Sequence, residues 1–175
     1  MRRLSGPRSR SDGKRLAAVG NDGVGGVSWI ASFGSPAYYF GLVVSPSGGV
    51  VYAVHYIPSG GGDVKAFAVG VNGALAEFGT PPATGDYPNA IAITDDGNWL
   101  YVANRDDNTI SQYAVNGDDT LSALNPATAT ATHPSALRIS PDGQYLFATN
   151  YNGTGAAGNL VTTRVIGANG KLTAP

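Results

Sequence analysis

The sequence lacks cysteine altogether, and glutamate occurs once, at Glu77. Disulfide bonds, thiol nucleophiles and cysteine-ligated zinc sites are therefore excluded. Charged residues make up 13% of the chain, about half the usual share of a soluble domain, and helices favour the Glu, Lys, Leu and Gln that are scarce here. No run reaches the roughly 18 apolar residues of a membrane helix, and no apolar stretch follows the basic start as in a secretory signal. We expect no membrane contact and, by default, a cytoplasmic location.

Glycine is abundant instead, with 25 residues, and 42% of the chain is hydrophobic. This composition suits short strands joined by tight turns around a core. Six of the eleven basic residues lie in the first fifteen positions, and from residue 16 onward five basic residues face eleven acidic ones. A basic arm over residues 1–12 could touch nucleic acid or anionic lipid, but disorder is the favoured interpretation. The acidic body argues against a nucleic-acid-binding domain.

Three segments of the chain align without gaps, over residues 42–55, 91–104 and 137–150. Each contains a turn glycine, and these glycines are 49 and 46 residues apart. An aromatic residue follows each glycine by four positions. The glycines are Gly48, Gly97 and Gly143, and the aromatic residues are Tyr52, Tyr101 and Phe147. Internal repetition at a period of about 40–50 residues is typical of propeller architectures. We expect the side chains of Trp99, Tyr101, Tyr113 and Phe147, at repeat-equivalent or strand-alternating positions, to lie in the core.

The second half of each repeat is an alternating apolar–polar run followed by a turn that contains Asn-Gly. The runs cover residues 63–69, 109–115 and 159–165. Asn-Gly is a strong hairpin signal because both residues tolerate the positive φ of a tight turn. Each repeat is thus predicted to be four antiparallel strands, at about 89–94, 98–104, 109–115 and 121–126 in the middle one. The predicted fold class is all-β, a partial β-propeller of four-stranded antiparallel blades.

We expect three blades, at residues 40–87, 88–133 and 134–175, after a degenerate partial blade at 13–39. Seven blades at this period would need about 330 residues. The chain is therefore incomplete, or two chains complete a ring, or four blades close alone; the first is favoured. An open arc leaves two blade faces without a neighbour, which predicts self-association through them.

The segments 101–124, which begins Y-V-A-N-R-D-D-N-T-I-S-Q-Y, and 133–153, which begins H-P-S-A-L-R-I-S-P-D-G, resemble the seven-bladed propeller lactonases. That family includes bacterial 6-phosphogluconolactonases and fungal carboxymuconate-lactonising enzymes. The resemblance covers about residues 40–175. It implies hydrolysis or formation of a small lactone near the central channel, without a metal or other cofactor. The predicted partner is a small-molecule lactone, with sugar-lactone hydrolysis as the favoured reaction.

Strand order places the second-to-third loops and the blade crossovers on one face of a propeller. Both histidines of the chain fall there. Opening a lactone needs a base for water and a donor for the developing oxyanion. We therefore predict His133, then His55, as base, and Arg105 as the anion-binding group. The predicted substrate-binding residues on the same face are Tyr87, Asn104, Asn150 and Tyr151.

Other interpretations of these residues stay open. A histidine before proline in a crossover is more often bonded to backbone than catalytic. The loop 104–108 is rich in oxygen ligands and suggests calcium, but Asp and Asn are also ordinary turn formers, so no metal site is predicted. The alternative to a lactonase is a non-catalytic propeller that binds a protein or glycan through its loops, because fold alone does not fix function.

Overall fold

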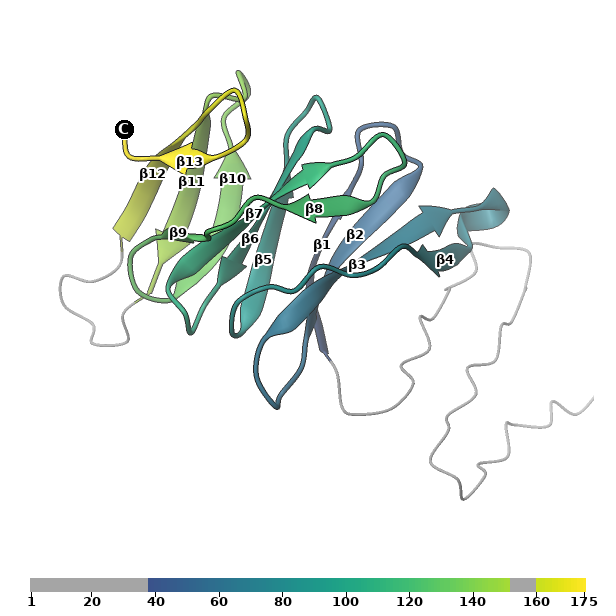
Figure 1. Cartoon of the computed structure of the whole chain (residues 1–175), viewed down its shortest axis with the longest axis horizontal. Helices are drawn as coiled ribbons and strands as arrows, with labels where there is room; N and C mark the ends of the chain where they lie inside the picture. Colours follow the sequence, from purple (N-terminus) through teal and green to yellow (C-terminus); the bar gives the residue numbers. More distant parts are fainter. Residues whose placement is uncertain (1–37, 152–159) are drawn as a thin grey trace, which may run out of the picture.

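The computed structural model describes residues 38–151 and 160–175 of the chain (Figure 1). The predicted arm at 1–12 and all but two residues of the predicted partial blade at 13–39 lie outside the described residues. The described strands are β1 (Tyr38–Val44), β2 (Val50–Tyr56), β3 (Gly62–Val69), β4 (Leu75–Phe78), β5 (Pro88–Ile93), β6 (Trp99–Asn104), β7 (Thr109–Val115), β8 (Leu121–Ala123), β9 (Thr128–Ala129), β10 (Pro134–Ile139), β11 (Tyr145–Asn150), β12 (Leu160–Ile166) and β13 (Leu172–Thr173). A single turn of 3-10 helix, η1 (Val71–Gly73), joins β3 to β4. Among the described residues, no helix is long and apolar enough to cross a membrane.

The strands form three antiparallel sheets that follow one another along the chain. The orders are β1-β2-β3-β4, β5-β6-β7-β8 and β10-β11-β12-β13, and the short strand β9 pairs with β7. The first strands β1, β5 and β10 lie side by side, and the sheets fan out from them as an arc (Figure 1). The predicted fold class, an all-β partial propeller of four-stranded blades, is confirmed. The sequence analysis did not predict β9.

The first hairpin of each sheet is closed by the repeated glycine. Gly48, Gly97 and Gly143 have φ of 73°, 75° and 71°. Residues other than glycine adopt this left-handed conformation with difficulty. A hydroxyl before the turn supports the same geometry. In the middle sheet, Thr94 donates a hydrogen bond to Asp96 over 2.5 Å and accepts one from the backbone N–H of Trp99. The bond from Thr94 to the ionised carboxylate lowers the pKa of Asp96. The hairpin prediction from glycine spacing therefore has a direct structural cause.

Each first strand begins with the same irregularity. The pairing with the second strand shifts register between Tyr39 and Gly41, between Pro88 and Ala90, and between Pro134 and Ala136. A β-bulge of this kind leaves one residue unpaired and bends the strand. The bulged residues are Phe40, Asn89 and Ser135. The residues that precede the two prolines, Tyr87 and His133, have positive φ of 48° and 46°. Crossover and bulge together set where the side chains at this end of each sheet point.

Two apolar clusters hold the three sheets together, one at each junction. Leu100 and Val102 of the middle sheet pack against Tyr52 and Val54 of the first. At the next junction, Ala103 and Ile110 of the middle sheet share a cluster with Leu146 of the third. Buried apolar area of this kind is the main stabilising contribution of a folded chain, and each junction therefore acts as its own small core.

A tyrosine hydroxyl reaches forward across each junction. Tyr52 donates to the carbonyl of Asp119 over 2.8 Å, and Tyr101 donates to the carbonyl of Gly170 over 2.9 Å. Both acceptors lie in the turn between the third and fourth strands of the following sheet. Burial raises the pKa of Tyr52 to about 12. The two bonds satisfy polar atoms that burial would otherwise leave unpaired.

A second hydrogen bond crosses each junction in the opposite direction. Tyr113 donates to the carbonyl of Ala83 over 2.7 Å, and Arg164 donates to the carbonyl of Ala129 over 2.8 Å. Both acceptors lie in the crossover segment of the preceding sheet; Ala83 bridges to Asp63, and Ala129 pairs with β7. The two junctions thus share one scheme of reciprocal hydrogen bonds.

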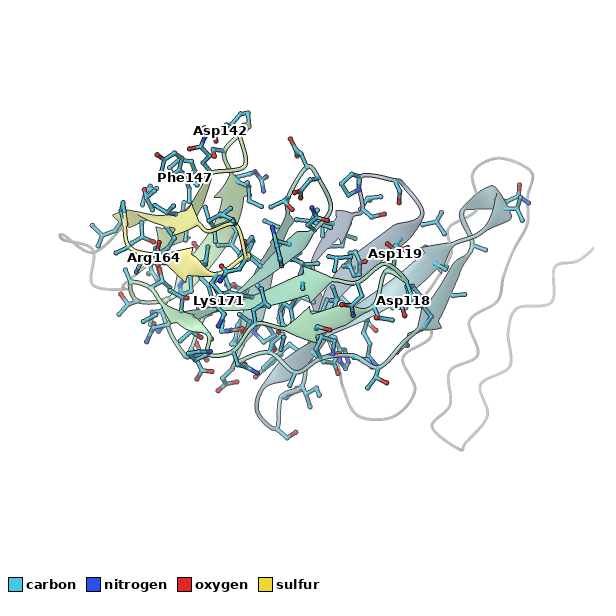
Figure 2. All side chains as sticks on the ribbon, turned by 45° about the horizontal axis from the view of Figure 1, so that its top comes forward. Asp118, Asp119, Asp142, Phe147, Arg164 and Lys171 are labelled. Carbon is cyan, nitrogen blue, oxygen red and sulfur yellow. The ribbon has the colours of Figure 1, made fainter. Side chains whose placement is uncertain are left out.

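Within residues 38–151 and 160–175, no further sheet covers either outer face of the arc. Leu42 and Val44 of β1 are 64% and 51% exposed, and Phe147 and Val161 of the third sheet are 37% and 68% exposed. Figure 2 shows Phe147 on the sheet at the end of the arc. The expectation that Phe147 lies in the core is wrong, because no following sheet covers its face among the described residues. Tyr52 and Tyr101, at the equivalent positions, are buried by such a sheet.

Candidate functional site

The β2–β3 and β6–β7 loops and the crossovers gather at one end of the sheets, along the lower edge of Figure 1. Tyr87 and His133 occupy the same place in two successive repeats, directly before the proline that opens the first strand. Arg105 and Tyr151 also share a place, directly after the second strand. We call this the crossover end. It carries most of the residues that the sequence analysis predicted as functional.

His133 is fixed at the junction between the second and third sheets. Its backbone N–H donates to Oδ1 of Asn108 over 2.7 Å, and its Nδ1 lies 3.0 Å from the carbonyl oxygen of Tyr151. Because a carbonyl only accepts, Nδ1 carries the proton in this contact. Nε2 is then the basic nitrogen. The residue is partly exposed, so Nε2 belongs to an imidazole that solvent can reach and that is held in one tautomer.

His55 lies in the first sheet and has a carboxylate partner. Its Nδ1 lies 3.0 Å from Oδ1 of Asp63, and its ring centroid lies 5.2 Å from that of Tyr39. A carboxylate at Nδ1 fixes the orientation of the ring. The imidazole is largely buried. The sequence analysis missed Asp63, although strand alternation places it directly opposite His55 in the β2–β3 pair.

The structure does not bring the two histidines together as one pair. His55 is in the first sheet, His133 precedes the third, and the middle sheet β5–β8 stands between those two. His55 is the repeat counterpart of Asn104 and Asn150, at the last or next-to-last residue of the second strand. His133 is the counterpart of Tyr87. The two imidazoles are therefore separate candidates for a base.

Arg105 lies against Tyr87, which the sequence analysis also predicted in the site. Its guanidinium carbon is 5.0 Å from the centroid of the tyrosine ring, a cation–π contact. Nη1 of Arg105 donates to Oδ1 of Asp106 over 3.0 Å, in an exposed ion pair. A guanidinium has five N–H groups, so the ion pair leaves Arg105 with further donors. Tyr87 and Arg105 are thus in contact, with a carboxylate beside the cation.

Asn104 and Asn150 are buried, with 0% and 3% exposure. The side-chain amide of Asn104 donates to Thr109 and Ser111, and that of Asn150 donates to Thr162. Both asparagines link the second strand to the third. Their predicted contact with substrate stays a prediction that this geometry does not favour. Strand alternation already predicts that both asparagines are buried, because each lies two positions after a buried residue of its strand, Val102 or Ala148.

Tyr151 completes the group at the second junction. Its backbone N–H donates to the carbonyl of His133 over 3.1 Å, and its side chain is half exposed. The backbone of Tyr151 therefore holds His133 from both sides, while its own ring is accessible to solvent. Within residues 38–151 and 160–175, no group of three or more His, Asp or Glu side chains is arranged to hold a metal ion.

Two cavities lie at the opposite end of the sheets, beside the first hairpins. One, of about 430 Å³, lies between the turns at Asp96 and Asp142, and the other, of about 310 Å³, lies between the turns at Ser47 and Gly97. They recur at equivalent places of the two junctions, so they follow from the spacing of neighbouring hairpins. Neither cavity is lined by a histidine.

Comparison with known proteins identifies the group to which these sheets belong. Residues 80–174, more than half of the chain, match the sequence model of the lactonase family with a seven-bladed β-propeller. The chain belongs to this lactonase family. The resemblance of the blade motifs is thus confirmed. No curated protein matches the chain in sequence.

Solved structures of lactonase-type propellers share this fold. A candidate 6-phosphogluconolactonase from Bacteroides uniformis is 26% identical, with a TM-score of 0.70, over 85% of this chain and 42% of that one. A second, from Bacteroides fragilis, is 25% identical with a TM-score of 0.64, over 75% and 36% of the two chains. The periplasmic gluconolactonase of Pseudomonas aeruginosa is 21% identical with a TM-score of 0.60, over 78% and 39%. The chain therefore spans less than half the length of these relatives.

Proposed function

We propose that the crossover end of this chain takes part in the hydrolysis of a small sugar lactone, with His133 as the general base. The observation that carries the proposal is the bond from Nδ1 of His133 to the carbonyl of Tyr151, which leaves Nε2 as the proton acceptor of a partly exposed ring. Membership of the lactonase family supports lactone chemistry.

The reaction needs one base and one water. Nε2 of His133 takes a proton from water, and the oxygen of that water bonds to the carbonyl carbon of the lactone. The resulting oxyanion collapses, the ring C–O bond breaks, and the leaving alkoxide takes the proton back from the imidazolium. The product is the open hydroxy acid, and His133 is restored. All atoms of lactone and water are accounted for without a cofactor.

Arg105 is the proposed donor to the developing oxyanion. Its ion pair with Asp106 fixes the guanidinium, and its further N–H groups supply the hydrogen bonds that stabilise negative charge. His55, held by Asp63, is a second candidate base. Tyr87 and Tyr151 are the proposed substrate-binding side chains, since both lie beside these groups at the crossover end.

Hydrolysis of glucono-δ-lactone and its 6-phosphate by the full chain tests the proposal, with proton release recorded at constant pH. His133→Gln should lower the rate by about 10² or more, whereas His55→Gln should have a smaller effect.

Tyr145→Phe is the control variant, because Tyr145 begins β11 at the opposite end of the sheets. It should hydrolyse lactone at the wild-type rate. A wild-type rate no faster than the reaction without protein would contradict the proposal and favour a binding module. So would equal rates for wild type and His133→Gln.

A further inference from the structure

Four aromatic side chains form a continuous cluster at the crossover end of the first junction. We call Tyr38, Phe40, Tyr56 and Tyr87 the aromatic patch. The ring centroids of Tyr56 and Tyr87 are 4.7 Å apart, and those of Phe40 and Tyr87 are 5.2 Å apart with nearly parallel planes. Tyr38 stacks on Phe40 and on Tyr56 at 6.3 and 6.4 Å. Tyr38 and Phe40 are 51% and 44% exposed.

The blade fold does not require this patch. The bulge that holds Phe40 holds Asn89 in the second sheet and Ser135 in the third. Tyr56 lies four residues after the turn aromatic Tyr52, and its counterparts are Arg105 in the second repeat and Tyr151 in the third. Since the same scaffold forms with polar residues at the bulge, packing of the sheets does not explain exposed aromatic rings. Exposed apolar patches at such places mark ligand sites, and ligand sites are commonly lined by aromatic side chains with a few polar groups.

Carboxylates surround the patch on its polar side. Asp86 accepts hydrogen bonds from the backbone N–H groups of Gly61 and Tyr87 over 3.2 and 2.9 Å. Asp107 accepts one from the backbone N–H of Asp86 over 2.7 Å. Asp106 is paired with Arg105. Three carboxylates therefore accompany one guanidinium, and that cation already has an anionic partner.

The tyrosine at the centre of the patch responds to these charges. Partial desolvation raises the pKa of the Tyr56 hydroxyl, and the negative charges of Asp86 and Asp106 raise it further. A phenolate at this position is disfavoured by the carboxylates, and the negative charge of a bound ligand would be disfavoured for the same reason.

We infer that the aromatic patch binds the ring of an uncharged sugar lactone and selects it over the 6-phosphorylated form. The inference rests on the proposed lactone chemistry and adds the substrate class. Flat aromatic faces suit the apolar C–H face of a sugar ring, and Arg105 and the tyrosine hydroxyls suit its oxygen atoms. A cationic ligand is disfavoured because the guanidinium of Arg105 occupies the cation position over Tyr87. A phosphate would have to displace Asp106 and approach Asp86 and Asp107.

Binding of two stable probes tests this directly, namely D-gluconolactam and its 6-phosphate, titrated calorimetrically into the full chain. The wild-type protein should bind the neutral lactam about fivefold to tenfold more tightly than the phosphate. Added salt should reduce this preference, since it screens exposed charges. Asp106→Asn should strengthen phosphate binding about twofold to fivefold and so shift the preference between the two probes toward the phosphate.

Phe40→Ala should weaken lactam binding about threefold to tenfold, through the lost stacking surface. Tyr145→Ala removes an equally exposed ring outside the patch and is the matched control, with wild-type binding expected. Tighter binding of the phosphate, no binding of either probe, or equal effects of Phe40→Ala and Tyr145→Ala would overturn the inference. Lactam binding without lactone hydrolysis would overturn the proposed reaction and leave the patch as a sugar site.

Discussion

At the junction between the first and second sheets, Tyr52 and Tyr113 donate hydrogen bonds in opposite directions, and at the next junction Tyr101 and Arg164 do the same. The two junctions therefore have the same pair of hydrogen bonds across their middle. Their crossover ends differ. Phe40, Tyr56 and Tyr87 make the first one aromatic, whereas the second carries Asn89 and His133. The comparison teaches that the repeat fixes the scaffold, while the crossover positions are free to vary and carry the chemistry.

The largest expected effect comes from removing a buried tyrosine that crosses a junction, because both junctions depend on such a residue. Tyr101→Ala should destabilise the chain by about 3–5 kcal/mol, because it empties a fully buried site and removes the bond to Gly170. Tyr101→Phe removes only the hydroxyl and should cost about 1 kcal/mol. Urea unfolding measures both. Equal losses for the two variants would show that the ring contributes nothing to the second junction.

The two backward hydrogen bonds offer a finer comparison. Tyr113→Phe should cost about 1 kcal/mol, because Tyr113 is buried and its removal leaves the Ala83 carbonyl without this donor. Arg164→Met should cost less, about 0.5 kcal/mol, since the bond from Arg164 to Ala129 is exposed to water. The same unfolding measurement ranks the two. A larger loss for Arg164→Met would mean that the second junction depends on this bond more than the first does.

High pH should loosen both junctions. Burial raises the pKa of Tyr52 and of Tyr113 to about 12, and raises that of Tyr101 as well. These groups stay protonated in the folded chain when the unfolded chain ionises near pH 10, so their stabilising effect is complete below pH 10 and declines as pH rises toward 12. Thermal unfolding between pH 9 and 12 should show this decline. Tyr52→Phe should reduce its slope, and an unchanged slope would contradict the assignment.

The smallest effect is expected at the first hairpins. Hydrogen bonds from Thr94 and Asn98 lower the pKa of Asp96. Asp96 therefore stabilises the fold above about pH 4, and its contribution is lost as pH falls through its lowered folded-state pKa. Asp96→Asn should cost a few tenths of a kcal/mol at pH 7 and less at pH 2. Chemical unfolding at the two pH values measures the difference, and an equal cost at both would exclude a role for the charge.

The sequence predicted the sheets well because their causes are local. Gly48, Gly97 and Gly143 define hairpins that need positive φ, and alternation defines the strands between them. The same alternation also predicts the burial of Asn104 and Asn150, since each lies two positions after a buried residue of its strand. The exposure of Phe147 does not follow from the pattern of its own strand, since the burial of Phe147 depends on a further sheet.

The sequence did not predict the aromatic patch, for a different reason. Phe40 lies at a bulge, where strand alternation breaks, and Tyr87 has positive φ, so neither side-chain direction follows from the period of the strand. The partnership of His55 with Asp63 depends on strand register. The roles of His133 and Arg105 are set by tertiary contacts with Tyr151, Asp106 and Tyr87, which pattern alone does not supply.

Mapping the response of backbone amides to D-gluconolactam by NMR tests most directly whether ligand binds at the crossover end. The account predicts shifts for Tyr56, Tyr87, Arg105 and His133, and none for the first hairpins at Gly97 and Gly143. Shifts confined to those hairpins, where the two cavities lie, would place the ligand at the wrong end of the sheets and contradict the account.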